Sequence, residues 1–110
     1  MFLAPVALAT TAAAAPVGAV RGDARFVGCR EEAIAVAQAE GAKVDAAAIR
    51  ALHDQAPAEV RSSMQKDVAA GRQPELDAIA GPIIRAGKRH GIPTPNTITL
   101  AAEVRANPHR

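Results

Sequence analysis

The apolar residues of this chain are mostly alanine, and this feature limits most strongly what the chain can fold into. Its 110 residues include 28 alanines but only 23 Val, Ile, Leu and Phe together, with no Trp or Tyr. Alanine favours helix and lets helices approach closely, but each alanine buries little apolar area. The length suffices for one domain with one modest core. We therefore expect residues 1–110 to form a single helical domain that associates with a partner surface.

The charge pattern argues against nucleic acid as a partner. The formal net charge is only +2, the basic residues are dispersed, and two phenylalanines are the only aromatic residues available for stacking on bases. Cys29 is the single cysteine, so no internal disulfide can form, which fits a reducing cytoplasm. Without a neighbouring histidine on its expected helix, Cys29 is interpreted as a small buried apolar residue.

Two interpretations of the first twenty residues remain open. An alanine-rich first helix could end at Pro16 and Gly18, or the apolar run could be a signal peptide. A signal peptide needs a positively charged start, whereas the first charge here is Arg21 and Pro5 interrupts the apolar run. A membrane span is disfavoured because Thr, Gly and two prolines dilute a segment that is mostly alanine.

Helical periodicity between proline and glycine signals predicts the rest of the chain. The predicted helices lie within residues 22–41, 45–55, 57–71, 74–91 and 94–108. Asp23, Asp45 and Thr94 are expected caps, and Pro57 and Pro74 are expected at first helical positions. No alternating apolar run of strand length is present. The sequence therefore predicts an all-α fold, a compact bundle of about five or six helices without a sheet.

Each predicted helix has a stripe of apolar side chains that should face the core. Ile49 and Leu52 are the expected inward residues of the helix over 45–55. Pro82 should kink the helix over 74–91 or remove one of its backbone bonds. The remaining stripes are Phe26, Val27, Arg30, Ile34 and Ala37; Val60, Met64 and Val68; and Leu76, Ile79, Ile83 and Ile84.

The polar stretch "SSMQKDVAAGRQPELDAIAG" over residues 62–81 allows two interpretations, a solvated surface without a functional role or the wall of a binding cleft. With Val60, Met64 and Val68 packed inward, Ser63 and Asp67 lie four residues apart beside that stripe. Glu75 lies at the start of the next helix, where free amide groups favour a carboxylate. Ser63 and Glu75 could be a solvated hydroxyl and a compensating charge, or they could flank a space that a small polar substrate bridges.

The segment "SSMQKDVAAGRQPELDAIAGPIIRAGKRHGIPTPNT" resembles, in a gapless register, the signature of the ketopantoate reductases (2-dehydropantoate 2-reductases). More weakly, "APVGAVRGDARF" resembles the linker between the first two helices of their C-terminal domain. The matching residues are Ser62, Ser63, Met64, Asp67, Gly71, Arg72, Glu75, Leu76, Asp77, Gly81, Gly91, Ile92, Pro93, Thr94 and Pro95. The resemblance implies the family's C-terminal helical fold, which is similar to the C-terminal domain of 6-phosphogluconate dehydrogenase.

This resemblance also implies an activity and roles for two residues. Members of the family reduce ketopantoate, a small 2-keto acid, to pantoate with NADPH, on the route to pantothenate and coenzyme A. Their active site lies between an N-terminal Rossmann domain and the helical domain. The resemblance implies that Ser63 contacts the substrate, as a hydroxyl that donates or accepts hydrogen bonds can, and that Glu75 lies at the catalytic cleft.

The chain also departs from the family's pattern, both at the cofactor site and on the first helix of this domain. It has no G-x-G-x-x-G loop and no βαβ unit, and it lacks the lysine that the family carries at the start of this domain's first helix. The family's asparagines on the same helix have no match either, and Leu3, Ala4 and Ala7 occupy that region. We therefore expect a chain that is inactive alone, binds no NADP(H) by itself, and pairs with a Rossmann-type domain or a second copy of itself. Three explanations stay open: a fragment of a reductase, one chain of a split reductase, or a non-catalytic helical interaction module.

Overall fold

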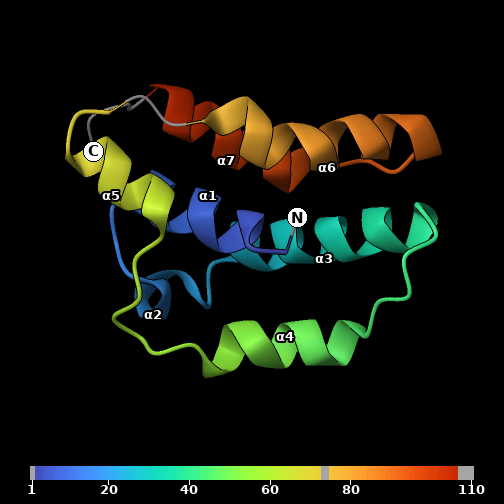
Figure 1. Cartoon of the computed structure of the whole chain (residues 1–110), viewed down its shortest axis with the longest axis horizontal. Coiled ribbons are helices and arrows are strands. Elements are labelled where there is room, and N and C mark those ends of the chain that lie inside the picture. Colours follow the sequence, from blue (N-terminus) through green and yellow to red (C-terminus); the bar gives the residue numbers. More distant parts are fainter. Residues whose placement is uncertain (1, 73–74, 107–110) are drawn as a thin grey trace.

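The computed structural model describes residues 2–72 and 75–106, and this part of the chain contains seven helices and no strand (Figure 1). The all-α prediction is confirmed. One helix more than the expected five or six is present because Val17–Val20 form a separate single turn behind Pro16. The helices are α1 (Ala4–Ala13), α2 (Val17–Val20), α3 (Ala24–Ala39), α4 (Ala46–Gln55), α5 (Ser63–Ala69), α6 (Leu76–His90) and α7 (Pro95–Ala106).

Helix α1 lies at the centre of the domain and packs against α2, α3, α5, α6 and α7. Figure 1 shows α6 and α7 side by side along one edge, α1 and α3 in the middle, and α4 along the opposite edge. The first-helix interpretation of the N-terminal segment therefore agrees with the structure. Among the described residues, no helix combines the length and the apolar character that crossing a membrane requires.

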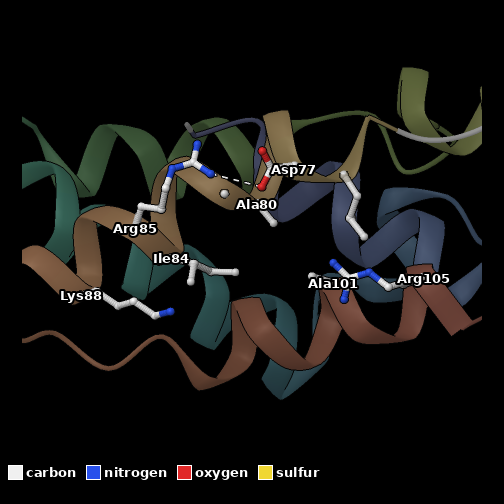
Figure 2. Close-up of a pocket in the computed structure, with 9 residues that line it drawn as sticks. Asp77, Ala80, Ile84, Arg85, Lys88, Ala101 and Arg105 are labelled. Atoms are coloured by element: carbon white, nitrogen blue, oxygen red, sulfur yellow. Dashed lines mark hydrogen bonds and ion pairs between the residues drawn. The ribbon is translucent and has the colours of Figure 1, made fainter.

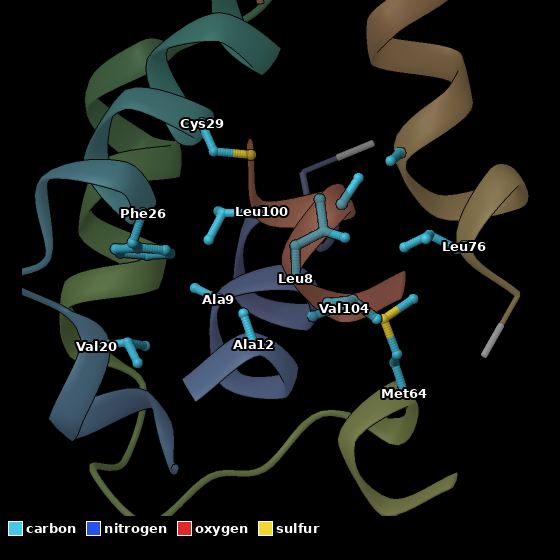
Figure 3. Packing of buried hydrophobic residues seen from close by; sticks show 13 residues of the cluster. Leu8, Ala9, Ala12, Val20, Phe26, Cys29, Met64, Leu76, Leu100 and Val104 are labelled. Carbon is cyan, nitrogen blue, oxygen red and sulfur yellow. The ribbon is translucent and has the colours of Figure 1, made fainter. Parts of the chain in front are cut away.

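The main core cluster joins side chains from five helices around α1 (Figure 3). Leu8 of α1 is completely buried, and Phe26 and Cys29 of α3 are equally inaccessible. Small residues fill much of the remaining space, as the composition predicts. The larger partners are Met64, Leu76, Leu100 and Val104.

Predicted caps begin two of the long helices. The Asp23 carboxylate accepts a hydrogen bond of 2.8 Å from the Arg25 amide at the start of α3. At the start of α4, Asp45 accepts one of 3.1 Å from the Ala48 amide. Such bonds satisfy amides that have no partner inside the helix.

The predicted start of α5 at Pro57 is wrong, because this helix begins at Ser63. Residues 57–62 form a turn and an extended stretch that lies along α2. The carbonyl groups of Val60 and Ala58 accept hydrogen bonds, both of 2.8 Å, from the amides of Val17 and Gly18. These bonds satisfy the first amides of α2, which has no side-chain cap. Val60 is consequently 37% exposed and does not belong to the core stripe of α5.

The predicted inward face of α4 is also wrong. Leu52 is 60% exposed and Ile49 is half-buried, whereas His53 is buried. This orientation follows from the way α4 is attached, since His53 reaches the start of α1 and charged side chains hold the rest of the helix. The burial of His53 was not predicted.

Helix α6 continues through Pro82 to His90 and begins at Leu76; Pro74 lies outside the described residues. It ends at Gly91, whose positive φ of 67° is the left-handed conformation that glycine adopts without strain. The chain then folds back closely. A Cβ atom at Gly87 would lie 2.7 Å from the Ile92 carbonyl oxygen, so only glycine fits at this crossing.

Candidate functional site

A groove of about 340 Å³ lies between the start of α1, the segment before α5, and α6. Most of its wall is apolar, and the polar groups are two serine hydroxyls and the Arg61 guanidinium. Such a combination suits a small molecule with an apolar body and a few polar groups. The lining residues are Leu3, Val6, Ala7, Val60, Arg61, Ser62, Ser63, Met64 and Ile79.

The two serines in this lining differ in their bonding. Ser62 caps α5 by accepting a hydrogen bond of 3.1 Å from the Gln65 amide, and its hydroxyl lies 2.9 Å from Thr10 Oγ1. Ser63, the first residue of α5, is exposed in the groove, and its hydroxyl bonds to no other described residue. It is therefore free to donate and accept hydrogen bonds. The structure places Ser63 where the sequence predicts a cleft wall; its contact with a substrate stays a prediction.

Asp67 and Glu75 are not among the residues that line this groove. The Asp67 carboxylate accepts a hydrogen bond of 2.9 Å from Arg72. Glu75 is exposed immediately before α6, and its side chain does not cap that helix. Ile79, one turn further along α6, is the residue of this helix that reaches the groove. The predicted role of Glu75 at a catalytic cleft therefore remains a prediction, and the groove formed by this chain does not include its side chain.

Sequence reasoning missed a buried carboxylate that organises α7. Glu32 of α3 accepts hydrogen bonds from the amide and side-chain Nδ2 of Asn96, both 2.9 Å long. It also accepts bonds from the amide and hydroxyl of Thr97, which measure 2.8 and 2.7 Å. A buried carboxylate is costly unless it is bonded in this way. The signal was available, because Glu32 shares a helical face with Cys29 and Val36, both completely buried.

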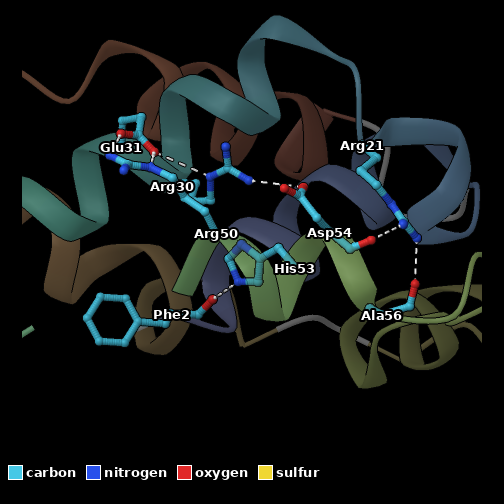
Figure 4. Close-up of polar contacts among 8 residues, drawn as sticks. All are labelled: Phe2, Arg21, Arg30, Glu31, Arg50, His53, Asp54 and Ala56. Atoms are coloured by element: carbon cyan, nitrogen blue, oxygen red, sulfur yellow. Dashed lines mark hydrogen bonds and ion pairs between the residues drawn. The ribbon is translucent and has the colours of Figure 1, made fainter. Parts of the chain in front are cut away.

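A set of charged side chains attaches α4 to the rest of the domain (Figure 4). Each ion pair has at least one largely exposed partner and contributes little, so several weak contacts hold α4. These contacts are Arg50 Nε to Glu31 at 3.0 Å, Arg30 to Asp54 at 3.5 Å, and Arg21 to the carbonyl groups of Asp54 and Ala56, the latter at 2.6 Å.

His53 makes the buried attachment of α4. Its Nε2 lies 2.8 Å from the Phe2 carbonyl oxygen, which requires an N–H at Nε2, and its ring packs on Phe26 with centroids 5.7 Å apart. The buried Nδ1 has no hydrogen-bond partner among the described residues. Burial lowers the pKa of His53 below its usual value, and the nearby Arg30 cation acts in the same direction. His53 is therefore neutral at pH 7. It holds Phe2, the residue next to Leu3 in the lining of the groove.

A second hollow of about 230 Å³ lies between α6 and α7 (Figure 2). Lys88 and Arg105 border it, and Arg85 donates a hydrogen bond of 3.1 Å to Asp77. These charged side chains are held at an open surface, with 55% of the Arg85 side chain and 89% of the Asp77 side chain exposed. Water therefore screens these charges strongly. This hollow is a weaker candidate for a binding site than the groove lined by Ser62 and Ser63, called the serine groove below.

Neither a metal site nor a reactive thiol is formed by the described residues. No group of three or more His, Cys, Asp or Glu side chains converges there to hold a metal ion. Burial raises the pKa of the Cys29 thiol to about 11, and the thiol lies 3.3 Å from Thr97 Oγ1, whose own hydrogen is donated to Glu32. A thiol that stays protonated at neutral pH is a poor nucleophile.

Comparisons with known proteins agree on one family. Residues 1–107 match the family described as "Ketopantoate reductase PanE/ApbA C terminal". A curated 2-dehydropantoate 2-reductase of Vibrio cholerae serotype O1 is 38% identical over 78 residues, which are 68% of this chain and 26% of that protein. The chain therefore spans about a quarter of this relative's length.

Solved structures share the fold. The PanE/ApbA family ketopantoate reductase of Ralstonia eutropha JMP134 has a TM-score of 0.81 at 35% identity, over 97% of this chain and 38% of that one. A dimeric ketopantoate reductase of Staphylococcus aureus has a TM-score of 0.82 over 97% of this chain and 40% of that one. Its identity is 23%, so that likeness supports the fold alone.

Proposed function

Because the chain belongs to the ketopantoate reductase family, we propose that it acts as the C-terminal domain of an NADPH-dependent 2-dehydropantoate 2-reductase. Such an enzyme reduces ketopantoate to pantoate for the synthesis of pantothenate and coenzyme A. The observation that carries the proposal is the groove at Ser63, which coincides with the part of the chain where the family signature is strongest. We further propose a cytoplasmic location, in keeping with the unpaired Cys29.

The residues that line the groove suit the chemistry of ketopantoate. The dimethyl-substituted carbon of this 2-keto acid would pack on the apolar wall formed by Val6, Met64 and Ile79. Its keto and carboxylate oxygens would accept a hydrogen bond from Ser63 and face the positive charge of Arg61 at the rim. Glu75 would act from the start of α6, next to the groove, by orienting the substrate or the general acid.

The described residues do not fit a dinucleotide. They contain no strand that leads into a glycine-rich loop at a helix N-terminus, the arrangement that holds a pyrophosphate. A Rossmann-type domain, in the same polypeptide or a separate one, would have to hold NADP(H). The general-acid lysine, which the family carries at the start of this domain's first helix, would have to come from the segment that joins the two domains. We therefore propose that this chain alone is inactive, and that it contributes substrate contacts and a docking surface.

The test is a fusion in which the chain follows the N-terminal domain of the Vibrio cholerae relative, with that protein's sequence retained up to this domain's first helix. The fusion should oxidise NADPH only when ketopantoate is present, whereas the 110-residue chain alone should not. Ketopantoate-dependent NADPH oxidation by the chain alone would refute its proposed dependence on a partner. A folded fusion without activity would favour the non-catalytic interaction module, and activity on mixing two separate chains would support a split reductase.

Variants of the fusion test the two proposed residues. Ser63→Ala should raise KM about two- to tenfold with little change in kcat, because one substrate hydrogen bond is lost in ground and transition states alike. Glu75→Ala should also lower kcat. Thr99→Ala, on the exposed side of α7, and Asp77→Ala, which lines the other hollow, are the matched controls and should change neither constant. Unchanged KM and kcat in the Ser63 and Glu75 variants would indicate that both residues are solvated surface residues without a role in the reaction.

A further inference from the structure

Thr10, in the middle of α1, lies directly behind the serine groove and is completely buried. Its hydroxyl oxygen lies 2.7 Å from the Val6 carbonyl oxygen, 3.4 Å from that of Ala7, and 2.9 Å from Ser62 Oγ. All three of these partners line the groove. Thr10 is therefore placed where the α1 wall and the serine wall of the groove meet.

The hydrogen positions along this set of contacts follow from the groups themselves. A hydroxyl has one hydrogen to donate. The Val6 carbonyl can only accept, so Thr10 donates to it, and Thr10 Oγ1 must then accept the hydrogen of Ser62. Ser62 Oγ in turn accepts from the Gln65 amide at 3.1 Å. The chain of donors runs from Gln65 through Ser62 and Thr10 to Val6, and each bond polarises the next.

This arrangement holds the residue next to Ser63. Ser62 caps α5 and Ser63 is the first residue of that helix, so a shift of the Ser62 hydroxyl would move the start of the helix and Ser63 with it. A second anchor of α5 is the buried side chain of Gln65, which faces Ala15 just after α1. The Gln65 side-chain amide donates to the Ala15 carbonyl at 3.2 Å and accepts from the Ala15 amide at 3.0 Å.

We propose that Thr10 is a positioning residue of the groove, which orients Ser63 toward the bound 2-keto acid through the hydrogen bond between Thr10 and Ser62. This inference rests on the proposed function for the identity of the ligand, but the hydrogen-bonded link itself does not. Nothing else in the described part of the chain bonds the Ser62 side chain to α1, so loss of the Thr10 hydroxyl should let the start of α5 shift about the anchor that remains at Gln65.

Thr11, the next residue of α1, provides a matched control. It is also buried, and its hydroxyl has no hydrogen-bond partner among the described residues. Thr10→Val and Thr11→Val are the same isosteric change in adjacent buried positions of one helix. Only the first removes a bond to the groove.

Two measurements separate this proposal from the proposed function. In the 110-residue chain, hydrogen exchange of the Gln65 amide should be about two- to tenfold faster in Thr10→Val, unchanged in Thr11→Val, and restored in Thr10→Ser. In the fusion with a Rossmann domain, the KM for ketopantoate should rise by a similar factor in Thr10→Val, with kcat nearly unchanged and with rescue by Thr10→Ser. The double variant Thr10→Val/Ser63→Ala should have the same KM for ketopantoate as Ser63→Ala alone, because both substitutions act on one substrate contact.

The outcomes are distinct. If wild-type fusion lacks ketopantoate reductase activity, the proposed function fails, and the exchange of the Gln65 amide alone decides whether Thr10 holds α5. Equal exchange in Thr10→Val and wild type would overturn the positioning role. So would an equal rise of KM in Thr10→Val and Thr11→Val, since that would indicate a general disturbance of α1.

Discussion

Replacing Glu32 with glutamine should destabilise the domain far more than an ordinary conservative substitution. The carboxylate accepts four hydrogen bonds, two on each oxygen, from the first turn of α7. In glutamine one oxygen becomes an NH₂ group that points at donors. The Thr97 hydroxyl can turn round and accept from it, but the Thr97 amide cannot. At least one buried backbone amide therefore loses its partner.

The magnitude follows from that orphaned group. A buried polar group left without a partner costs about 1–3 kcal/mol, and the surviving bonds weaken because their acceptor is no longer charged. Relief from burying a charge offsets part of this loss. We expect Glu32→Gln to lower the free energy of unfolding by about 2–3 kcal/mol, out of the roughly 5–15 kcal/mol typical of a whole domain. For a domain of this size the melting temperature should fall by about 8–12 °C.

Urea unfolding followed by far-UV circular dichroism measures this loss directly. Glu31→Gln is the control, because Glu31 is the neighbouring residue, pairs with Arg50, and has a side chain that is 40% exposed. Its replacement should cost no more than about 1 kcal/mol. If the two variants lost the same stability, Glu32 would not hold α7 in the way the hydrogen bonds indicate.

The buried groups His53 and Cys29 and the exposed apolar side chains each have a measurable consequence. Burial lowers the pKa of His53, so the folded state takes up a proton less readily than the unfolded chain. The stability of the fold should therefore fall as the pH drops below about 6.5. The variant His53→Gln keeps an N–H for the Phe2 carbonyl and should lack this part of the pH dependence. Cys29, with its pKa raised to about 11, should react slowly with iodoacetamide at pH 8 until urea unfolds the chain; rapid alkylation of the folded protein would contradict this. The chain alone should associate in sedimentation velocity, because Leu3 and Val60 leave apolar area exposed in the lining of the groove. A monomer that binds no apolar dye would count against this.

The sequence predicted the fold well where local signals decided it. The caps Asp23 and Asp45, the glycine after α6 and the absence of alternating apolar runs identify the helices without tertiary information. The failures have tertiary causes. Pro57 starts no helix because residues 57–62 satisfy the first amides of α2, which lie forty or more residues earlier in the chain.

Burial on α4 and around the candidate site was predictable only in part. The stripe of Ile49 and Leu52 indicates an inward face, but the hydrogen bond from His53 to Phe2 and the charged attachments turn the helix so that Leu52 is exposed. Ser63 was singled out by its spacing from the core residues of α5 and by the family resemblance. Thr10 could not be found in this way, because its importance depends on a contact with Ser62, 52 residues further along the chain.

The residues of the matching motif can be separated by what the fold itself requires. Ser62 caps α5 and Met64 fills the core, whereas Ser63 bonds to no described residue. Ser62→Ala should therefore cost about 0.5–2 kcal/mol of stability and Met64→Ala about 2–5 kcal/mol. Ser63→Ala should change stability by no more than about 0.5 kcal/mol, as expected for an exposed side chain. Urea unfolding of the three variants tests this order, and a loss in Ser63→Ala as large as that in Ser62→Ala would make Ser63 structural. A neutral result, beside a raised KM in the fusion, would leave substrate binding as the reason for a serine at this position.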